Sequence, residues 1–339
     1  MRGSGRPVWD DLASPDDLAA LDPGVPPDFD ATPDVLVVGG GVIGLAVAFF
    51  CRRAGMRVLI VERDRLAGCA SGRAAGGLSP DVHPDLGDAW QTLARESLEL
   101  HRRLDAELGF GLRPRDVLIP PDLRIANQAH VDPLRLAAAL ASEAGVVATG
   151  TECEYTLTSG GRVVTAVTSS GNVHPDAVVF ATGLAPPQVP SVRQQWVKGH
   201  LIATEPAPFV VDDIVTDGDI LVVQLPDGSL VAGGTKDRND SSDTVDAAVV
   251  SGVVQLSSSL VPQTNGLAIT HEWCCFRPSF PDERPVVDRV PGLSNAWFAA
   301  GFYSTGLLMA PAVGSLLAEW IGGERPRALE SMALDQAAS

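Results

Sequence analysis

The chain has 339 residues, of which 45% are hydrophobic, so it suits one large globular domain or two smaller ones. Its formal net charge of −17 argues against binding to nucleic acid or to an anionic membrane surface. Five irregularly spaced cysteines suggest neither a disulfide framework nor a zinc site, and no apolar run suits a signal peptide or a membrane span, so we expect a cytoplasmic protein.

Residues 1–33 form an acidic, proline-rich N-terminal extension. Within it, residues 16–21 suit a single helical turn. A segment of this composition has little apolar surface to bury, so we expect a tail that is flexible or draped on the body of the protein.

A strand, a helix and a second strand are predicted between residues 34 and 62. Val35–Val38 is an apolar, β-branched run that is typical of a strand buried in a parallel sheet. The helical pattern runs from Val42 to Arg53 and ends at Gly55, and residues 57–61 form the second strand.

Three glycines in the first turn have the spacing of a dinucleotide-binding motif. Gly39 makes the tight turn, Gly41 lets the backbone approach a pyrophosphate, and Gly44 lets the helix pack closely on the strand. The helix N-terminus directs free N–H groups at the phosphates, and Glu62 accepts hydrogen bonds from a ribose. The motif alone does not separate FAD from NAD.

The next segment, residues 63–80, is dense in small residues. Such a stretch either lets the backbone approach a large flat ligand or is a plain surface loop. We then expect an amphipathic helix over residues 90–108 and a short strand over 117–119. A further helix follows the capping residue Asp132 and extends to about residue 144.

Strands predominate in the rest of the chain. The predicted strands are residues 152–158, 162–168, 176–180, 201–204, 220–225, 229–232, 270–277 and 296–300, with a helix at 246–259. The last element is an apolar helix that begins at Gly306 and extends to about Ile321. Because it follows a strand and begins with glycine, its free N–H groups would stabilise negative charge on a redox ring.

The order of these motifs resembles the glycine oxidase, sarcosine oxidase and D-amino acid oxidase family of FAD enzymes. The matching segments span residues 34–323 and are VVGGGVIGLAVA, IVERD, ASGRAAGGLSP, HVDPLRLAAAL, VVFATG, VKGH, DGSLVAGGT, WCCFRPSFPDERPVVD and AAGFYSTGLLMAPAVG. The resemblance implies an α/β fold (α+β overall), in which a Rossmann-like FAD-binding domain is joined to a substrate domain with an antiparallel sheet.

The resemblance also implies a division into domains. Residues 34–80, 131–200 and 283–325 would form the discontinuous FAD-binding domain. Residues 81–130 and 201–282 would form the substrate domain, and residues 326–339 a C-terminal tail.

Cofactor-binding roles follow from the same resemblance. The residues implied to contact FAD are Gly39, Gly41, Val42, Ile43, Gly44, Glu62, Arg63, Ser71, Ala75, Gly76, Ala181, Thr182, Gly183, Cys275, Gly301, Ser304, Gly306 and Leu307. Cys275 falls where sarcosine oxidases carry the cysteine that is joined covalently to the flavin. Alternation along the strand puts Cys275 on the same face as Arg277, so both would face the flavin pocket.

Three residues are implied to act on the substrate. Arg277 matches the arginine with which glycine oxidase binds the substrate carboxylate, a task that suits its planar fork of donors. Tyr303 would make a polar contact at the mouth of the pocket. His200 lies in a family segment near the flavin and is either a site residue or a structural histidine.

Some positions depart from the family. Ser304 replaces a second carboxylate-binding arginine of glycine oxidase, and Ala232 stands where sarcosine oxidases carry an oxygen-activating lysine. The region between residues 119 and 131 is shorter than usual.

The resemblance implies a cytoplasmic flavoprotein oxidoreductase that acts on a small amine or amino acid. Hydride transfer from the carbon next to nitrogen to flavin N5 would give an imine, and O2 would be reduced to H2O2; no metal is implied, and the protein could be a homo-oligomer. The alternatives are an FAD-dependent dehydrogenase with another acceptor, a non-catalytic flavin-binding protein, and an NAD-dependent dehydrogenase.

Overall fold

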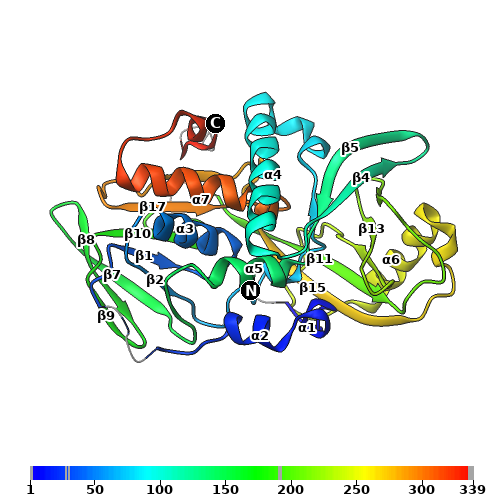
Figure 1. Cartoon of the computed structure of the whole chain (residues 1–339), viewed down its shortest axis with the longest axis horizontal. Coiled ribbons are helices and arrows are strands. Elements are labelled where there is room, and N and C mark those ends of the chain that lie inside the picture. The colour runs from blue at the N-terminus through cyan, green and yellow to red at the C-terminus, as the bar shows by residue number, and fades with distance from the viewer. Residues whose placement is uncertain (1–2, 27–28, 30, 190–192, 335–339) are drawn as a thin grey trace.

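Two large sheets stand side by side in the protein, with helix α4 (Asp88–Leu108) between them (Figure 1). This computed structural model describes residues 3–26, 29, 31–189 and 193–334. Within them, no helix is both long and apolar enough to cross a membrane.

The first sheet has six strands, and all its pairings are parallel except that of β16 with β17. In spatial order the strands are β16 (Val286–Arg289), β17 (Ala296–Ala300), β10 (Ala177–Gly183), β1 (Val35–Val38), β2 (Val58–Val61) and β6 (Val146–Ala148). The predicted parallel sheet is therefore confirmed, although the sequence analysis did not find β6 and β16.

Both faces of this sheet are covered, which explains why β1 is apolar throughout. Val35 and Val37 share a core cluster with helices α3 (Val42–Arg53) and α7 (Gly306–Gly322). Leu36 and Val38 belong to the cluster on the opposite face, against a three-stranded sheet. The strands of that small sheet are β7 (Cys153–Ser159), β8 (Arg162–Thr168) and β9 (Gly171–Val173).

The second large sheet has eight strands, which are antiparallel apart from the pair β12–β4. In order they are β15 (Ile269–Ser279), β11 (Gln195–Thr204), β14 (Leu230–Gly233), β13 (Leu221–Gln224), β12 (Ile214–Thr216), β4 (Arg113–Ile119), β5 (Leu123–His130) and β3 (Gly77–Leu78). Helix α6 (Ala247–Leu260) packs on one face through Val250 and Val253. A second, mostly antiparallel sheet was expected and is confirmed.

The structure differs from the sequence analysis in one missed strand and at two of the predicted segment boundaries. Strand β5 was not predicted, because half of its residues are polar and half are exposed, so no apolar run marks it. Strand β3 and the first residues of β11 pair within the eight-stranded sheet, although we had drawn the FAD-binding segments to residues 80 and 200. The division into domains itself stays a prediction.

The described part of the N-terminal extension packs on the body of the protein. It forms α1 (Trp9–Leu12) and α2 (Pro15–Leu21), and both Trp9 and Leu21 are fully buried. Helix α2 lies against α5 (Pro133–Ala141), which is capped by the Asp132 carboxylate as predicted. Short 3₁₀ helices complete the chain at Ser71–Arg73, Pro80–Val82, Pro84–Leu86, Pro262–Thr264 and Arg327–Met332.

Gly44 should tolerate no side chain. A Cβ there would lie 2.0 Å from the Gly39 carbonyl oxygen, whereas a Cβ at Gly252, also inside a helix, would meet nothing within 4 Å. We expect Gly44→Ala to lower the free energy of unfolding in urea by about 1–3 kcal/mol, as for an overpacked core. Gly252→Ala should raise it by about 0.5–1 kcal/mol. A neutral Gly44→Ala would contradict the close packing of α3.

Candidate active site

A cavity of about 700 Å³ lies between the two large sheets. Residues at the carboxyl ends of β1 and β10 line one end of it, and residues of the eight-stranded sheet line the other. In open α/β sheets this edge, outside the carboxyl ends of the strands, is where ligands bind.

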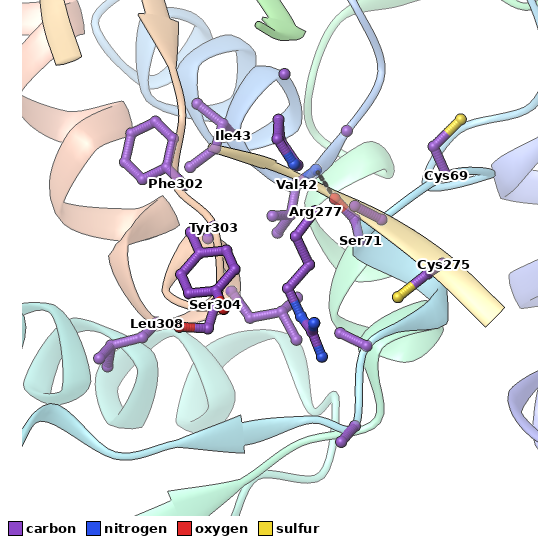
Figure 2. Close-up of a pocket in the computed structure, with 18 of the residues that line it drawn as sticks. Val42, Ile43, Cys69, Ser71, Cys275, Arg277, Phe302, Tyr303, Ser304 and Leu308 are labelled. Atoms are coloured by element: carbon purple, nitrogen blue, oxygen red, sulfur yellow. Dashed lines mark hydrogen bonds between the residues drawn. The ribbon is translucent and has the colours of Figure 1, made fainter. Parts of the chain in front are cut away.

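The glycine turn forms the first wall of the cavity. Gly39 has a φ of +108°, and a Cβ there would lie 2.6 Å from the Ala181 carbonyl oxygen, so only glycine fits. At the start of α3, the Val42 N–H donates to Ser71 Oγ at 3.0 Å (Figure 2). Gly41 also lines this end, where the helix N-terminus favours an anion.

Glu62 follows β2 and lines the same end of the cavity. Its two carboxylate oxygens accept hydrogen bonds from the N–H groups of Gly40, at 2.7 Å, and Asp64, at 3.0 Å. Each oxygen keeps a further lone pair, so the carboxylate is oriented and still able to accept from a ribose hydroxyl. Arg63 lines the cavity with a mostly exposed side chain.

His130 supports the loop that forms the cavity floor. Its Nε2 lies 2.9 Å from the Ala75 carbonyl oxygen, and Gly76, with a φ of +89°, passes so close that a Cβ would lie 2.2 Å from the Val131 oxygen. Burial lowers the pKa of His130 to about 3, with Arg113 acting in the same direction, so this imidazole is neutral. His130 opens the segment HVDPLRLAAAL, which carries part of the family resemblance, but the sequence analysis gave it no role in the site.

Arg277 and Cys275 both direct their side chains into the cavity from β15 (Figure 2). This agrees with the alternation expected along the strand. The Arg277 Nη1 donates to the Thr235 carbonyl oxygen at 2.8 Å. A Cβ at Gly199, on the neighbouring strand β11, would lie 2.6 Å from that nitrogen, so glycine at 199 makes room for the guanidinium.

Tyr303 lies between two arginines. Its ring centroid is 5.8 Å from the Arg277 Cζ and 5.9 Å from the Arg238 Cζ, and Arg238 in turn pairs with Glu283. The Tyr303 hydroxyl is buried and has no hydrogen-bond partner among the described residues. Burial raises the pKa of Tyr303, which keeps the phenol neutral and able to donate.

Most of the residues named from the sequence are brought together here. Those that line the cavity are Gly39, Gly41, Val42, Ile43, Glu62, Arg63, Ser71, Ala75, Gly76, Ala181, Thr182, Gly183, Cys275, Arg277, Tyr303, Ser304, Gly306 and Leu307. Gly44 and Gly301 do not line it: a Cβ on Gly44 would meet the Gly39 carbonyl oxygen, and one on Gly301 would meet the Phe280 ring.

His200 does not face the cavity. It lies on the opposite face of β11, where its Nε2 accepts a hydrogen bond from the Asp246 N–H at the start of α6, at 3.1 Å. Ala232 packs on the same far face, with Ile202 and Val222. Neither residue lines the cavity, so His200 fits the structural alternative, and Val231 is the residue of β14 that joins the core cluster on the cavity side.

An apolar wall completes the cavity and was not found from the sequence. Its residues come from the eight-stranded sheet, the turn before β13, and α7, and are Val117, Ile119, Ile214, Ile220, Leu221 and Leu308. Apart from Val117 and Ile119, which share β4, each lies on a separate segment, so no local pattern reveals them. No group of His, Cys, Asp or Glu side chains in the described ranges could hold a metal ion.

The sequence model of the DAO family, described as FAD dependent oxidoreductase, matches residues 34–124 and 119–320. Glycine oxidase from Pseudomonas aeruginosa is 26% identical over 353 residues, covering 86% of this chain and 95% of that protein. Glycine oxidase from Bacillus licheniformis is 23% identical over 344 residues, covering 86% and 93%.

Two solved structures show the same fold. The glycine oxidase of Geobacillus kaustophilus superposes with a TM-score of 0.82 at 23% identity, covering 90% of this chain and 98% of the other. The L-proline dehydrogenase of P. horikoshii superposes with a TM-score of 0.83 at 18% identity, covering 91% and 99%.

Tyr303→Phe should separate ligand binding from stability. Because the hydroxyl has no partner in the described structure, its loss should leave the urea unfolding midpoint unchanged or slightly raised. Calorimetric affinity for acetate should fall about five- to tenfold, as for one lost hydrogen bond. Tyr155→Phe, at an exposed site on β7, is the matched control. Equal affinity in both variants would show that the phenol contacts no ligand.

Proposed function

We propose, since the chain belongs to the DAO family of FAD-dependent oxidoreductases, that it oxidises the C–N bond of a small amino acid or amine that carries a carboxylate. Bound FAD would accept a hydride from the carbon next to nitrogen and pass the electrons to O2, so that an imine and H2O2 are formed. The family match shows an FAD-dependent enzyme that acts on C–N bonds. We propose the kind of substrate and the electron acceptor.

The residues fit FAD at the end of the cavity where the glycine turn lies. The free N–H groups of α3 and the close backbone at Gly41 suit a pyrophosphate, and Glu62 suits the adenosine ribose. The N-terminus of α7 begins with Gly306 and Leu307, which line the same cavity. These N–H groups would stabilise negative charge on the bound cofactor.

The observation that carries the proposal is the placement of Arg277 in this same cavity. Its only hydrogen bond among the described residues goes from Nη1 to Thr235, which fixes the guanidinium plane and leaves further donors for a carboxylate. The neutral Tyr303 hydroxyl supplies one more donor beside it. Together they would orient the substrate so that the carbon next to nitrogen faces the cofactor.

The apolar wall indicates which kind of side chain the substrate would carry. A carboxylate bound to Arg277 would leave a side chain among Ile214, Leu221 and their neighbours, which suits an apolar group. The acidic Asp219 also lines the cavity and would repel an acidic side chain, with Lys236 as the nearby cation. We therefore favour an amino acid with an apolar side chain over an acidic one. The relatives named glycine oxidase show that a substrate without a side chain is also to be tested.

A dehydrogenase is the second candidate. The resemblance to sarcosine oxidases predicts a lysine on β14, where this chain has Val231 and Ala232. Transfer of electrons to an acceptor other than O2 would leave the first half of the reaction unchanged.

Anaerobic titration of the purified protein tests the proposal. We expect a flavin absorbance band that is bleached by glycine, sarcosine, proline or an apolar D-amino acid and restored by air with formation of H2O2. Bleaching that air does not reverse would favour the dehydrogenase. A flavin band that no amine bleaches would indicate a non-catalytic flavin-binding protein, and no flavin band would remove FAD from the proposal.

Arg277→Ala should weaken binding of the reducing amino acid without releasing FAD. Truncating one partner of a buried charge pair costs about 2–4 kcal/mol, so we expect kcat/KM to fall about 30- to 1,000-fold, mainly through KM. Arg289→Ala, an exposed arginine on β16, is the control. An unchanged kcat/KM in Arg277→Ala would remove its role as the carboxylate anchor.

Cys275 decides whether FAD is attached covalently. It lines the cavity, but burial raises the pKa of its thiol, with Arg277 and Arg73 acting in the opposite direction. The thiolate is the nucleophilic form, so we expect a free thiol and non-covalent FAD. Acid precipitation should leave all the flavin in the supernatant, as it should for Cys275→Ala. Flavin that stays with the wild-type precipitate, but not with the variant, would show a covalent link.

A further inference from the structure

The described N-terminal residues 3–24, here called the strap, lie outside the part of the chain that matches the family. They nevertheless touch both large sheets. Ser4 pairs with Cys274 at the free edge of β15, and Gly24 exchanges hydrogen bonds with Thr149, directly after β6. In Figure 1 helices α1 and α2 of the strap lie beneath α5, at the junction of the two halves.

The strap enters this position through two glycines. Gly3 and Gly5 have φ values of +82° and +74°. A Cβ on Gly3 would lie 2.2 Å from the Cys274 oxygen, and one on Gly5 would lie 2.1 Å from the Glu272 oxygen. The sequence Gly3-Ser4-Gly5 is therefore required for the backbone to lie flat along the strand edge.

A buried arginine joins the strap to the cavity loop. Arg73 donates to the carbonyl oxygens of Ser4, Gly5 and Cys274 at 2.9–3.0 Å. It ends the short helix that begins at Ser71, whose hydroxyl accepts from the Val42 N–H at the start of α3. Without the strap, two of these three acceptors would be gone and a buried cation would lose partners.

Trp9 touches the loop directly. Its Nε1 donates to the Ala74 carbonyl oxygen at 2.9 Å, and its ring lies 6.0 Å from that of His130, which contacts the Ala75 oxygen. Ala74 and Ala75 both line the cavity, and their carbonyl oxygens are thus contacted by Trp9 and by His130, respectively.

The C-terminal part of the strap is connected to the glycine turn through Leu66 and Ala67. The Leu66 N–H donates to the Leu21 oxygen at 2.8 Å, and the next N–H, of Ala67, donates to the Gly40 oxygen at 2.9 Å. Asp10 forms an ion pair of 2.6 Å with Arg65, the residue before this pair. The strap thereby contacts the segment 65–74 at both of its ends.

From these contacts we propose that the strap is a positioning element for the cofactor: it holds residues 65–76 in the form that binds FAD, with Trp9 as its principal positioning residue. The proposal rests on the FAD site proposed above. It implies that the strap determines FAD affinity although none of its described residues lines the cavity.

Removing the Trp9 donor tests the proposal. Trp9→Phe keeps an aromatic ring beside His130 but removes the donor to the partly buried Ala74 oxygen. We expect the FAD dissociation constant of the apoprotein, from flavin fluorescence, to rise at least about fivefold. The flavin absorbance band should also shift. Trp297→Phe is the control, because the Trp297 Nε1 is buried with no hydrogen-bond partner in the described structure.

A second pair of variants displaces the strap without touching the loop. Gly5→Ala should raise the FAD dissociation constant as Trp9→Phe does. Gly55→Ala, at another positive φ with nothing within 4 Å, should leave it unchanged. If wild-type protein binds FAD and Trp9→Phe and Gly5→Ala bind it equally well, the strap proposal fails alone. If wild-type protein binds no FAD, the proposed function fails and this inference with it.

Discussion

The close approach of backbones around the glycine turn is the constraint on which the cavity depends. Gly39 lies against Ala181 of β10, Gly44 lies against Gly39, and Gly314 of α7 lies against the Ala46 backbone, each so close that a Cβ would be within 2.6 Å of a carbonyl oxygen. At these glycines the backbones of β10, β1, α3 and α7 come into close contact. As a result, the N-termini of both helices reach one edge of one sheet, where their N–H groups can act on a single ligand.

Local patterns predicted the elements that are buried on both faces or strongly amphipathic. Strand β1 and helix α3 were recognised because Val35–Val38 is uniformly apolar and the glycine spacing separates strand from helix. Strand β5 was missed because half of its side chains are polar and no apolar run marks it; its backbone pairs with β4. Register between distant strands carries no local signature, so the sequence predicted no order of the strands within either sheet.

The same limit applies to the candidate site, where contacts between distant segments leave no local pattern in the sequence. Alternation along β15 correctly put Cys275 and Arg277 on one face, since both belong to one strand. The sequence left His200 open as a site residue or a structural histidine, because its face depends on how β11 pairs with β15: Gly199, not His200, lies opposite Cys275. Tyr303 is flanked by arginines from separate segments, and only folding brings Arg238 beside it. The long loop between β14 and α6 carries Arg238, so no spacing rule could connect the two residues.

Strand β15 joins the chemistry of the cavity to the strap outside it. Its odd-numbered residues Cys275 and Arg277 face the cavity, while the backbone of Cys274, at the sheet edge, binds Ser4 and Arg73. An edge strand is normally the least constrained part of a sheet, because one side of its backbone lacks partners. Here the strap supplies those partners, and Arg73 links the same point to the cavity loop. Arg277 and the loop of residues 65–76 therefore share one support, so that a displacement of β15 would move both.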